Sequence, residues 1–188
     1  MLKQISLLIL CAVAIVLFAT PVHACTSAVV SGKVTLDGRP LLWKNRDTDF
    51  MRNHVDYVKG ERYDFIAVVN SANAYLKEAW MGTNSAGFAL MNTQSYNLVD
   101  VKGDEERGAA NGRVIYRALE VCATVEDFCH FLDTISKPSD IEANFGVIDA
   151  QGGAAMFEVD YYKYVMYDAN NPKDAPYGYI AVSYTHLT

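Results

Sequence analysis

The chain has 188 residues, a length that fits one compact domain and makes a two-domain enzyme unexpected. Hydrophobic residues make up 51% of the sequence and charged residues 20%, a balance typical of a folded globular protein rather than a disordered one. The net charge is −6 and no run is rich in Lys or Arg, so a nucleic-acid partner is not expected.

The N-terminal segment has the pattern of an export signal. Lys3 precedes an unbroken apolar run from Leu7 to Ala19, which is shorter than the ~20 residues of a membrane-spanning helix but fits the core of a signal peptide. Small residues ending at Ala24 predict cleavage before Cys25. We therefore expect residues 1–24 to be a signal peptide, the mature protein to be periplasmic or extracellular, and no stable membrane insertion after cleavage.

Cleavage would leave Cys25 as the first residue, and two interpretations of that cysteine compete. In a bacterial lipoprotein it is lipidated and anchors the chain. The positions where Leu and a small residue usually stand hold Val22 and His23, and the histidine is a poor fit. In an N-terminal nucleophile enzyme the thiol attacks, and its own α-amine, whose ordinary pKa is ~7.7–8.0, acts as the base. A Cys–His dyad is not favoured, because His54 lies in a polar segment and His130 at the surface edge of an expected helix.

Apolar and β-branched segments predict strands along the first half of the mature chain, at 25–32, 40–44, 63–69, more weakly at 74–80, and at 88–92. Asp37-Gly38 predicts the turn of a hairpin between the first two. Asn84-Ser85-Ala86-Gly87 predicts another turn, and the polar stretch 96–108 a surface loop.

A pair of helices is expected next. Apolar residues recur at helical spacing from Val114 to Cys122, and Thr124 with Asp127 predicts a capping box that opens a second helix ending at Lys137-Pro138. Strands are then expected at 144–149, 154–160 and 161–167, with another beginning at 179. Strands, a helix pair and strands again predict a single α+β layered domain.

The last residues do not continue this pattern. Residues 183–188 give the final expected strand no natural close, so we expect them to be a non-native tail. The domain at 25–182 is accordingly expected to be incomplete at its C-terminus.

The opening of the mature chain resembles a known class of enzymes. Cys25-Thr26-Ser27, the hairpin and then Asn45-Arg46-Asp47-Thr48-Asp49-Phe50 are similar to the start of the cysteine-type N-terminal nucleophile (Ntn) hydrolases. Within that class the chain resembles the isopenicillin-N acyltransferase-like peptidases and the choloylglycine hydrolases, which act on linear amide C–N bonds. Asp47 departs from the Asn that these families commonly carry. Segments 83–89, 112–125 and 144–150 extend the resemblance, which implies an αββα sandwich.

The resemblance implies roles for five residues. Cys25 would attack the amide carbonyl while its α-amine carries the proton to the leaving amine. Arg46 would lower the thiol pKa or hold the carboxylate that fixes the site. Asp49 would orient the α-amine, Asn92 would donate to the oxyanion, and Asn144 would be a second polar group. A further arginine of these families has no counterpart in this sequence.

The same residues also have ordinary structural interpretations. Arg46 would form a solvated loop ion pair with Asp47 and Asp49. Asn92 would end a strand, and Asn144 would satisfy backbone groups at a strand start. Without Cys25 as a processed N-terminus, the loop ion pair would be the preferred interpretation of Arg46.

Other chemistry has little support in the sequence. No metal-ligand spacing, phosphate loop or nucleotide motif is present, so we expect neither a metal nor a cofactor. Cys122 and Cys129 fall on apolar helix faces and are expected to be free thiols. A disulfide between them is the alternative, because an exported protein folds in an oxidising compartment.

The sequence therefore predicts an exported N-terminal-cysteine amidohydrolase or acyltransferase. Its substrate would be a small-molecule linear non-peptide amide, such as an N-acyl amine or a bile-salt-like or penicillin-like amide. Two alternatives remain: a non-catalytic surface lipoprotein lipidated at Cys25, and an N-terminal-cysteine dipeptidase, whose opening also has a Cys-Thr pair and an Asp-Gly turn. A homo-oligomer is left open.

Overall fold

The computed structural model of the chain describes residues 25–95 and 110–183, and in these ranges two antiparallel sheets dominate. The large sheet has the strand order β3-β4-β5-β6-β7-β8-β9, and the small sheet has the order β10-β1-β2. Their bounds are β1 Thr26–Val30, β2 Leu41–Asn45, β3 Asn53–Val58, β4 Phe65–Asn70, β5 Met81–Asn84, β6 Ala89–Gln94, β7 Ala143–Ile148, β8 Ala154–Val159, β9 Tyr164–Asp168 and β10 Tyr179–Ser183.

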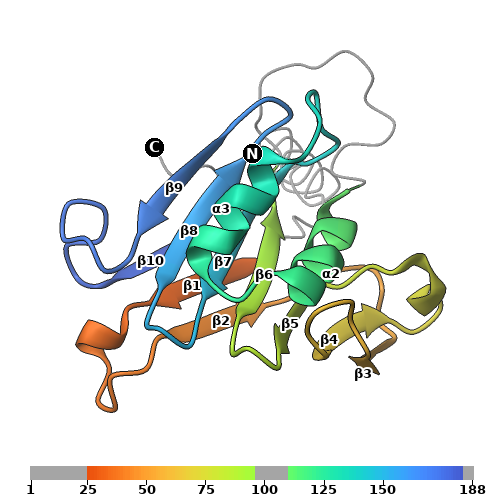
Figure 1. The fold of residues 1–188 in the computed structure, drawn as a ribbon, viewed down its shortest axis with the longest axis horizontal. Coiled ribbons are helices and arrows are strands. Elements are labelled where there is room, and N and C mark those ends of the chain that lie inside the picture. The colour runs from red at the N-terminus through yellow and green to blue at the C-terminus, as the bar shows by residue number, and fades with distance from the viewer. Residues whose placement is uncertain (1–24, 96–109, 184–188) are drawn as a thin grey trace, which may run out of the picture.

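Two helices cover one face of the large sheet, and the small sheet crosses its other face (Figure 1). They are α2 (Asn111–Val121) and α3 (Val125–Asp133), and the 3₁₀ turns η1 (Gly32–Val34) and η2 (Ala74–Leu76) lie in loops. Thr124 and Asp127 form the expected capping box at the start of α3. The described residues thus make three layers of the expected αββα sandwich, and they contain no helix on the outer face of the small sheet.

Each interface between layers has its own apolar core. Five fully buried aromatic rings fill the space between the helices and the large sheet, namely Phe65, Phe88, Phe128, Phe145 and Phe157. A smaller cluster containing Val29, Met91 and Met156 lies between the two sheets. Because alternate residues of a strand face opposite sides, the central strands carry apolar residues on both faces, as expected for a sheet covered on both sides.

Most of the expected elements are confirmed. The first hairpin, the helix pair and the strands at 63–69, 88–92, 144–149, 154–160 and 161–167 are present with shifts of a few residues at their ends. The strand beginning at 179 is also present: β10 pairs with β1 from Thr26↔Ser183 to Val30↔Tyr179. The expected signal peptide, the loop at 96–108 and residues 184–188 lie outside the described residues.

Three details differ from the expectation. The segment 74–80 is not a strand: it holds η2, and Lys77 then adopts a left-handed conformation with φ 54° that a strand does not accommodate. The second helix ends at Asp133, before the expected Lys137-Pro138. Strands β3 and β5 were not expected, because β3 carries polar residues and β5 is short.

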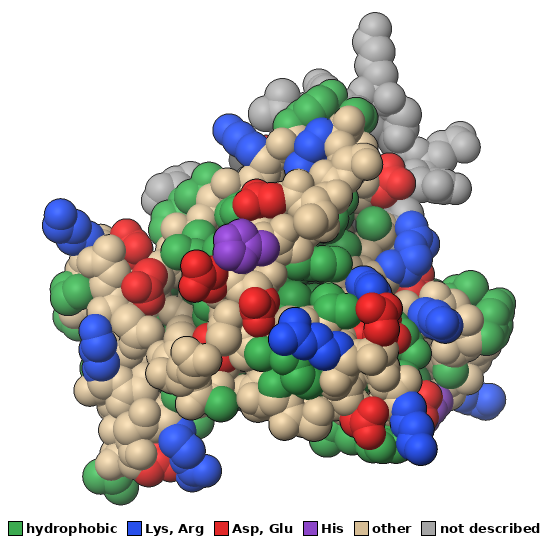
Figure 2. Space-filling view, viewed as in Figure 1, with side chains coloured by type: hydrophobic (Ala, Val, Ile, Leu, Met, Phe, Trp, Pro, Cys, Tyr) green, Lys and Arg blue, Asp and Glu red, His purple; other side chains and the backbone are tan. Residues whose placement is uncertain are grey.

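The surface carries mixed charge over the helix-bearing face. Acidic and basic side chains alternate there with no large patch of one sign (Figure 2). Within the described ranges, no helix is long and apolar enough to cross a membrane.

Candidate active site

The β1–β2 hairpin brings Cys25 beside the end of β2. Its register pairs Thr26 with Asn45, so Cys25 and Arg46 each lie one residue beyond the last pair of the ladder. Cys25 is half-buried, and its Sγ donates a hydrogen bond to the carbonyl oxygen of Asp47 over 3.4 Å. The local fold therefore places a thiol next to a guanidinium before any other part of the chain contributes.

A small cavity opens at this point. It has a volume of about 160 Å³ and takes its lining from the residue before β1, from β2 and the loop that follows it, from the residue before β5, and from β6. The lining residues are Cys25, Lys44, Arg46, Asp47, Thr48, Phe50, Trp80, Asn92 and Gln94. The cavity therefore joins the nucleophile candidate to side chains from distant parts of the sequence.

Arg46 is held from three directions. Its guanidinium donates to Asn53 Oδ1, and to Asn70 Oδ1 over 2.8 Å, from two asparagines that pair with each other across β3 and β4. Its Cζ also lies 5.1 Å from the centroid of the Trp80 ring, within range of a cation–π interaction. Burial lowers the pKa of Arg46 and Cys25 raises it, but a guanidinium stays charged at physiological pH. This cation is therefore fixed in place beside the thiol.

Asn92 lies on β6, is buried, and points its side chain into the same cavity. Its Oδ1 accepts a hydrogen bond of 3.1 Å from Lys44 Nζ. Lys44 also donates to the backbone oxygen of Trp80 over 2.9 Å. Asn92 is thus positioned as a polar group facing the Cys25 cavity, the placement required of an oxyanion donor.

The other two predicted site residues are not among those that line this cavity. Asp49 is exposed in the loop between β2 and β3. Asn144 is fully buried on β7, where its Nδ2 donates to Thr93 Oγ1 over 3.3 Å. The structure thus brings Cys25, Arg46 and Asn92 together in one cavity, and the catalytic roles of all five residues stay predictions.

Lys44 and Trp80 were missed by the sequence reasoning. A signal for Lys44 did exist: on the short strand β2 it alternates with exposed residues and shares the inward face with Leu42. A lysine at an inward strand position needs a reason to be there. No local pattern indicated Trp80.

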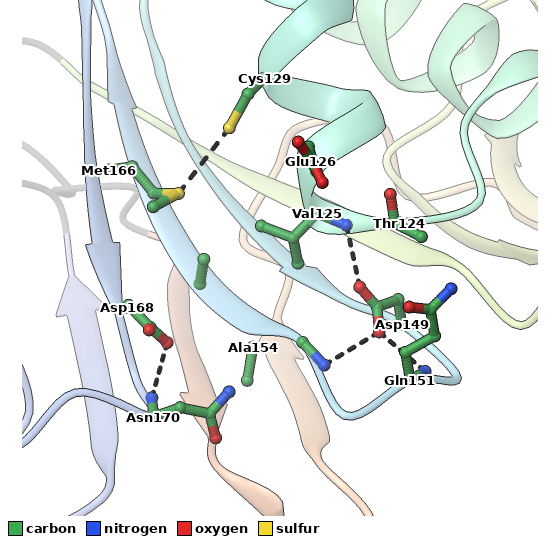
Figure 3. A pocket seen from close by; sticks show the side chains of 12 residues that line it. Thr124, Val125, Glu126, Cys129, Asp149, Gln151, Ala154, Met166, Asp168 and Asn170 are labelled. Carbon is green, nitrogen blue, oxygen red and sulfur yellow. Dashed lines mark hydrogen bonds between the residues drawn. The ribbon is translucent and has the colours of Figure 1, made fainter.

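A larger cavity, of about 470 Å³, lies at the start of α3 and does not include Cys25 (Figure 3). Its central carboxylate, Asp149, accepts hydrogen bonds from the backbone nitrogens of Val125, Gln151 and Gly153. These bonds hold the β7–β8 turn against the helix, which is a structural role. The described residues contain no group of His, Cys, Asp and Glu that could hold a metal ion.

The other two thiols of the described residues form no disulfide and are less suited to chemistry. Cys122 is buried and Cys129 half-buried. Burial raises the pKa of Cys122 to about 12, and burial also raises that of Cys129. His54 is exposed on β3 and contacts Ser71, and His130 is exposed on α3. Neither histidine lines the Cys25 cavity.

Comparison with known proteins identifies the family. Residues 35–173 match the family model of acyl-coenzyme A:6-aminopenicillanic acid acyl-transferase. The chain belongs to this family. Membership confirms the resemblance inferred from the sequence and places the chain among enzymes of the Ntn-hydrolase and acyl-transferase class. No curated protein sequence matches the chain significantly.

Solved structures share the fold. An N-acylethanolamine-hydrolyzing acid amidase ortholog from Caenorhabditis elegans matches with a TM-score of 0.65 and 12% identity, over 87% of this chain and 71% of that one. A variant of the conjugated bile acid hydrolase of Clostridium perfringens matches with a TM-score of 0.58 and 14% identity, over 87% of this chain. The present chain spans about half, 54%, of that hydrolase. These likenesses confirm the expected fold class.

Proposed function

We propose that the protein is an exported N-terminal-cysteine amidohydrolase or acyltransferase that acts on linear non-peptide amides. The observation that carries the proposal is the shared cavity of Cys25, Arg46 and Asn92. The thiol sits at the predicted cleavage point, so removal of residues 1–24 would give the nucleophile its own α-amine as a base. The substrate is a small molecule, and no metal or cofactor takes part.

The reaction needs two half-reactions. The α-amine takes the proton of the Cys25 thiol as sulfur attacks the amide carbonyl, and the carbonyl oxygen becomes an oxyanion that Asn92 Nδ2 stabilises. The C–N bond then breaks, and the leaving amine takes the proton from the α-ammonium. In the second half-reaction water, or an acceptor amine, attacks the thioester. Its proton passes to the α-amine and then to the departing thiolate.

Arg46 has an electrostatic role in this scheme. Its fixed positive charge lines the same cavity as the sulfur and faces the negative charge that forms during the attack. Asn53 and Asn70 keep the guanidinium in place without neutralising it, because both offer amide oxygens and not carboxylates. The net positive charge of Arg46 therefore stays available to the nucleophile.

The test is turnover of N-acyl amines by the processed protein. The panel includes N-acylethanolamines and bile acid conjugates, which the structural relatives are named for, and 6-aminopenicillanic acid as an acyl acceptor. Cys25→Ala should abolish turnover and Cys25→Ser should lose most of it, because the alcohol is a poorer nucleophile at neutral pH. The matched control is Cys129→Ala, which removes a half-buried thiol outside the cavity and should leave turnover unchanged.

Other results would favour the alternative functions. Turnover of dipeptides with no cleavage of acylated amines would point to a dipeptidase. A lipid attached to Cys25 would point to a lipoprotein, since a blocked α-amine cannot act as a base. Full turnover by Cys25→Ala would exclude this site as the source of any activity.

A further inference from the structure

Lys44 is the least expected side chain of the candidate site. It lies on the inward face of β2, across the β1–β2 ladder from Ser27. Its ammonium group spans the interlayer space to reach the backbone oxygen of Trp80 and Oδ1 of Asn92, at 2.9 and 3.1 Å. It thus links β2 of the small sheet to β6 of the large sheet and to the residue before β5.

The described part of the chain offers this ammonium no carboxylate partner. Among the described residues no Asp or Glu lies within ion-pair distance of Lys44, whereas the ion pairs of Arg39, Arg113 and Arg117 all lie elsewhere. The charged and titratable groups around it are Cys25 and Arg46, with Asp47 lining the same cavity. A partly buried cation is costly unless it is paired or hydrogen-bonded, so its retention here calls for a role.

The chemistry of the ammonium decides how Asn92 is turned. An ammonium only donates hydrogen bonds, so the atom of Asn92 that faces Lys44 must be the carbonyl oxygen and not the amide nitrogen. The amide nitrogen is then directed away from Lys44. It makes no hydrogen bond within the described part of the chain, and Asn92 lines the Cys25 cavity. The donor is therefore left available to a ligand.

We propose that Lys44 is the positioning residue of the oxyanion site. Its ammonium donates a hydrogen bond to Asn92 Oδ1 and so orients Nδ2 toward the carbonyl oxygen of the substrate. This inference rests on the proposed amidohydrolase function. Lys44 does not touch the reacting atoms in this scheme and acts through Asn92. A charged donor holds the amide more firmly than a neutral one would, since charge-assisted hydrogen bonds are roughly twice as strong.

The protonation state of Lys44 matters for this role. Burial lowers its pKa from 10.5 to about 8; Cys25 raises that pKa, and Arg46 lowers it further. Above this pH the neutral amine has a lone pair and can accept a hydrogen bond from Asn92 Nδ2. The orientation of the amide is then no longer enforced. The turnover number should therefore fall as the pH rises through about 8, in addition to any titration of the α-amine.

The experiment is a double-mutant cycle on the processed protein, with turnover of an N-acyl amine as the readout. Lys44→Met keeps the length and removes the charge and the donors. It should lower kcat at least ~10-fold with little change in KM, because an oxyanion donor acts in the transition state. In an Asn92→Ala background Lys44→Met should cost less than about 2-fold more, because two residues that act through one contact are not additive. Lys59→Met, at an exposed lysine, is the matched control.

Two further readouts separate positioning from a purely structural effect. Lys44→Arg keeps a permanent charge, so its activity should lack the decline near pH 8 that we predict for the parent protein. In ¹⁵N–¹H NMR spectra, the side-chain amide signals of Asn92 should titrate near pH 8 in the parent protein and not in Lys44→Met, whatever the turnover.

The outcomes distinguish this inference from the proposed function. If the parent protein turns over amides but Lys44→Met and Asn92→Ala are additive, Lys44 does not act through Asn92 and the inference is overturned. Amide signals of Asn92 that ignore the titration of Lys44 overturn it as well. If the parent protein cleaves no amide or activated ester, the proposed function fails, and the oxyanion role fails with it.

Discussion

Cys25 and Arg46 lie opposite each other at the end of the β1–β2 hairpin, one residue beyond its last pair, Thr26 and Asn45. Both line the same cavity. The distance between nucleophile and cation is therefore set by the register of the β1–β2 hairpin, whose connecting segment is residues 31–40. Because register is fixed by turn geometry, the turn is part of the site's construction.

The turn offers a matched pair of substitutions. A Cβ on Gly32 would lie 2.2 Å from the backbone oxygen of Gly38, so Gly32→Ala must displace one side of the turn. We expect it to lower the free energy of unfolding by about 3 kcal/mol. Gly38 has φ 75° but open space around it, so Gly38→Ala should cost only about 1–2 kcal/mol of backbone strain.

Urea unfolding of both variants measures these free energies, and turnover measures the effect on the site. Gly32→Ala should also lose activity, while Gly38→Ala should keep most of it. Equal effects of the two substitutions on both measurements would show that the close approach in the turn does not control the register.

The asparagines that hold Arg46 make a second prediction. Asn70 is buried and Asn53 is exposed, although both accept from the guanidinium. Asn70→Ala should therefore lower kcat/KM more than Asn53→Ala. Arg46→Lys should lower it roughly 10- to 100-fold, because an ammonium cannot form the fork that reaches both amides. Steady-state kinetics measures all three, and full activity of Arg46→Lys would show that the fork is dispensable.

Substitution of Asn84 is predicted to affect stability, whereas substitution of Asn92 is predicted to affect catalysis. Asn84 is buried and makes four side-chain hydrogen bonds, donating to the carbonyls of Leu119 and Cys122 and accepting from the nitrogens of Ala86 and Phe88. Asn84→Ala should lower the free energy of unfolding by about 3 kcal/mol or more, because it orphans buried backbone groups that cost about 1–3 kcal/mol each. Asn92→Ala should instead lower kcat by about 10²–10³-fold.

Thermal unfolding and turnover of the two variants give the comparison. A large loss of stability in Asn92→Ala with turnover preserved per folded molecule would contradict the assignment of Asn92 to the oxyanion site.

The relative rates at which the cysteines are alkylated provide a further prediction. Only the thiolate reacts, and burial raises the pKa of Cys122 to about 12, so its thiolate fraction at pH 8 is about 10⁻⁴. Burial also raises the pKa of Cys129. Iodoacetamide at pH 8 should therefore label Cys25 first, and Cys122 only in the unfolded chain. Peptide mass mapping after brief labelling measures this. Labelling of Cys122 at the same rate in the folded protein would contradict its burial.

The elements that the sequence predicted well are those with strong local signals. The Asp37-Gly38 turn, the Thr124–Asp127 capping box and the apolar strands around Phe145 and Phe157 each encode their structure within a few residues. Strand β3 has no such signal. It is an edge strand on which Val55 and Tyr57 are exposed, so it lacks the buried face that makes a strand recognisable.

In the candidate site, too, local contacts could be predicted from the sequence and long-range contacts could not. Cys25 and Arg46 could be linked in advance, because one hairpin joins them. Lys44 could not be linked to Asn92, because the contact joins residues 48 positions apart and depends on how the two sheets stack. The hydrogen bonds from Arg46 to Asn53 and Asn70 could not be predicted either, since Asn53 lies on β3, a strand that was not predicted.

The central claim is that Cys25, freed by cleavage after Ala24, is the nucleophile. The most direct test is the intact mass of the exported protein. It is measured once on the unreacted protein and once on protein that has reacted with an acyl donor and been quenched with acid. We predict a chain that begins at Cys25 with an unmodified α-amine and gains one acyl group on its thiol, removable by hydroxylamine. A chain that keeps residues 1–24 with undiminished turnover, or one that carries lipid on Cys25, would contradict the account.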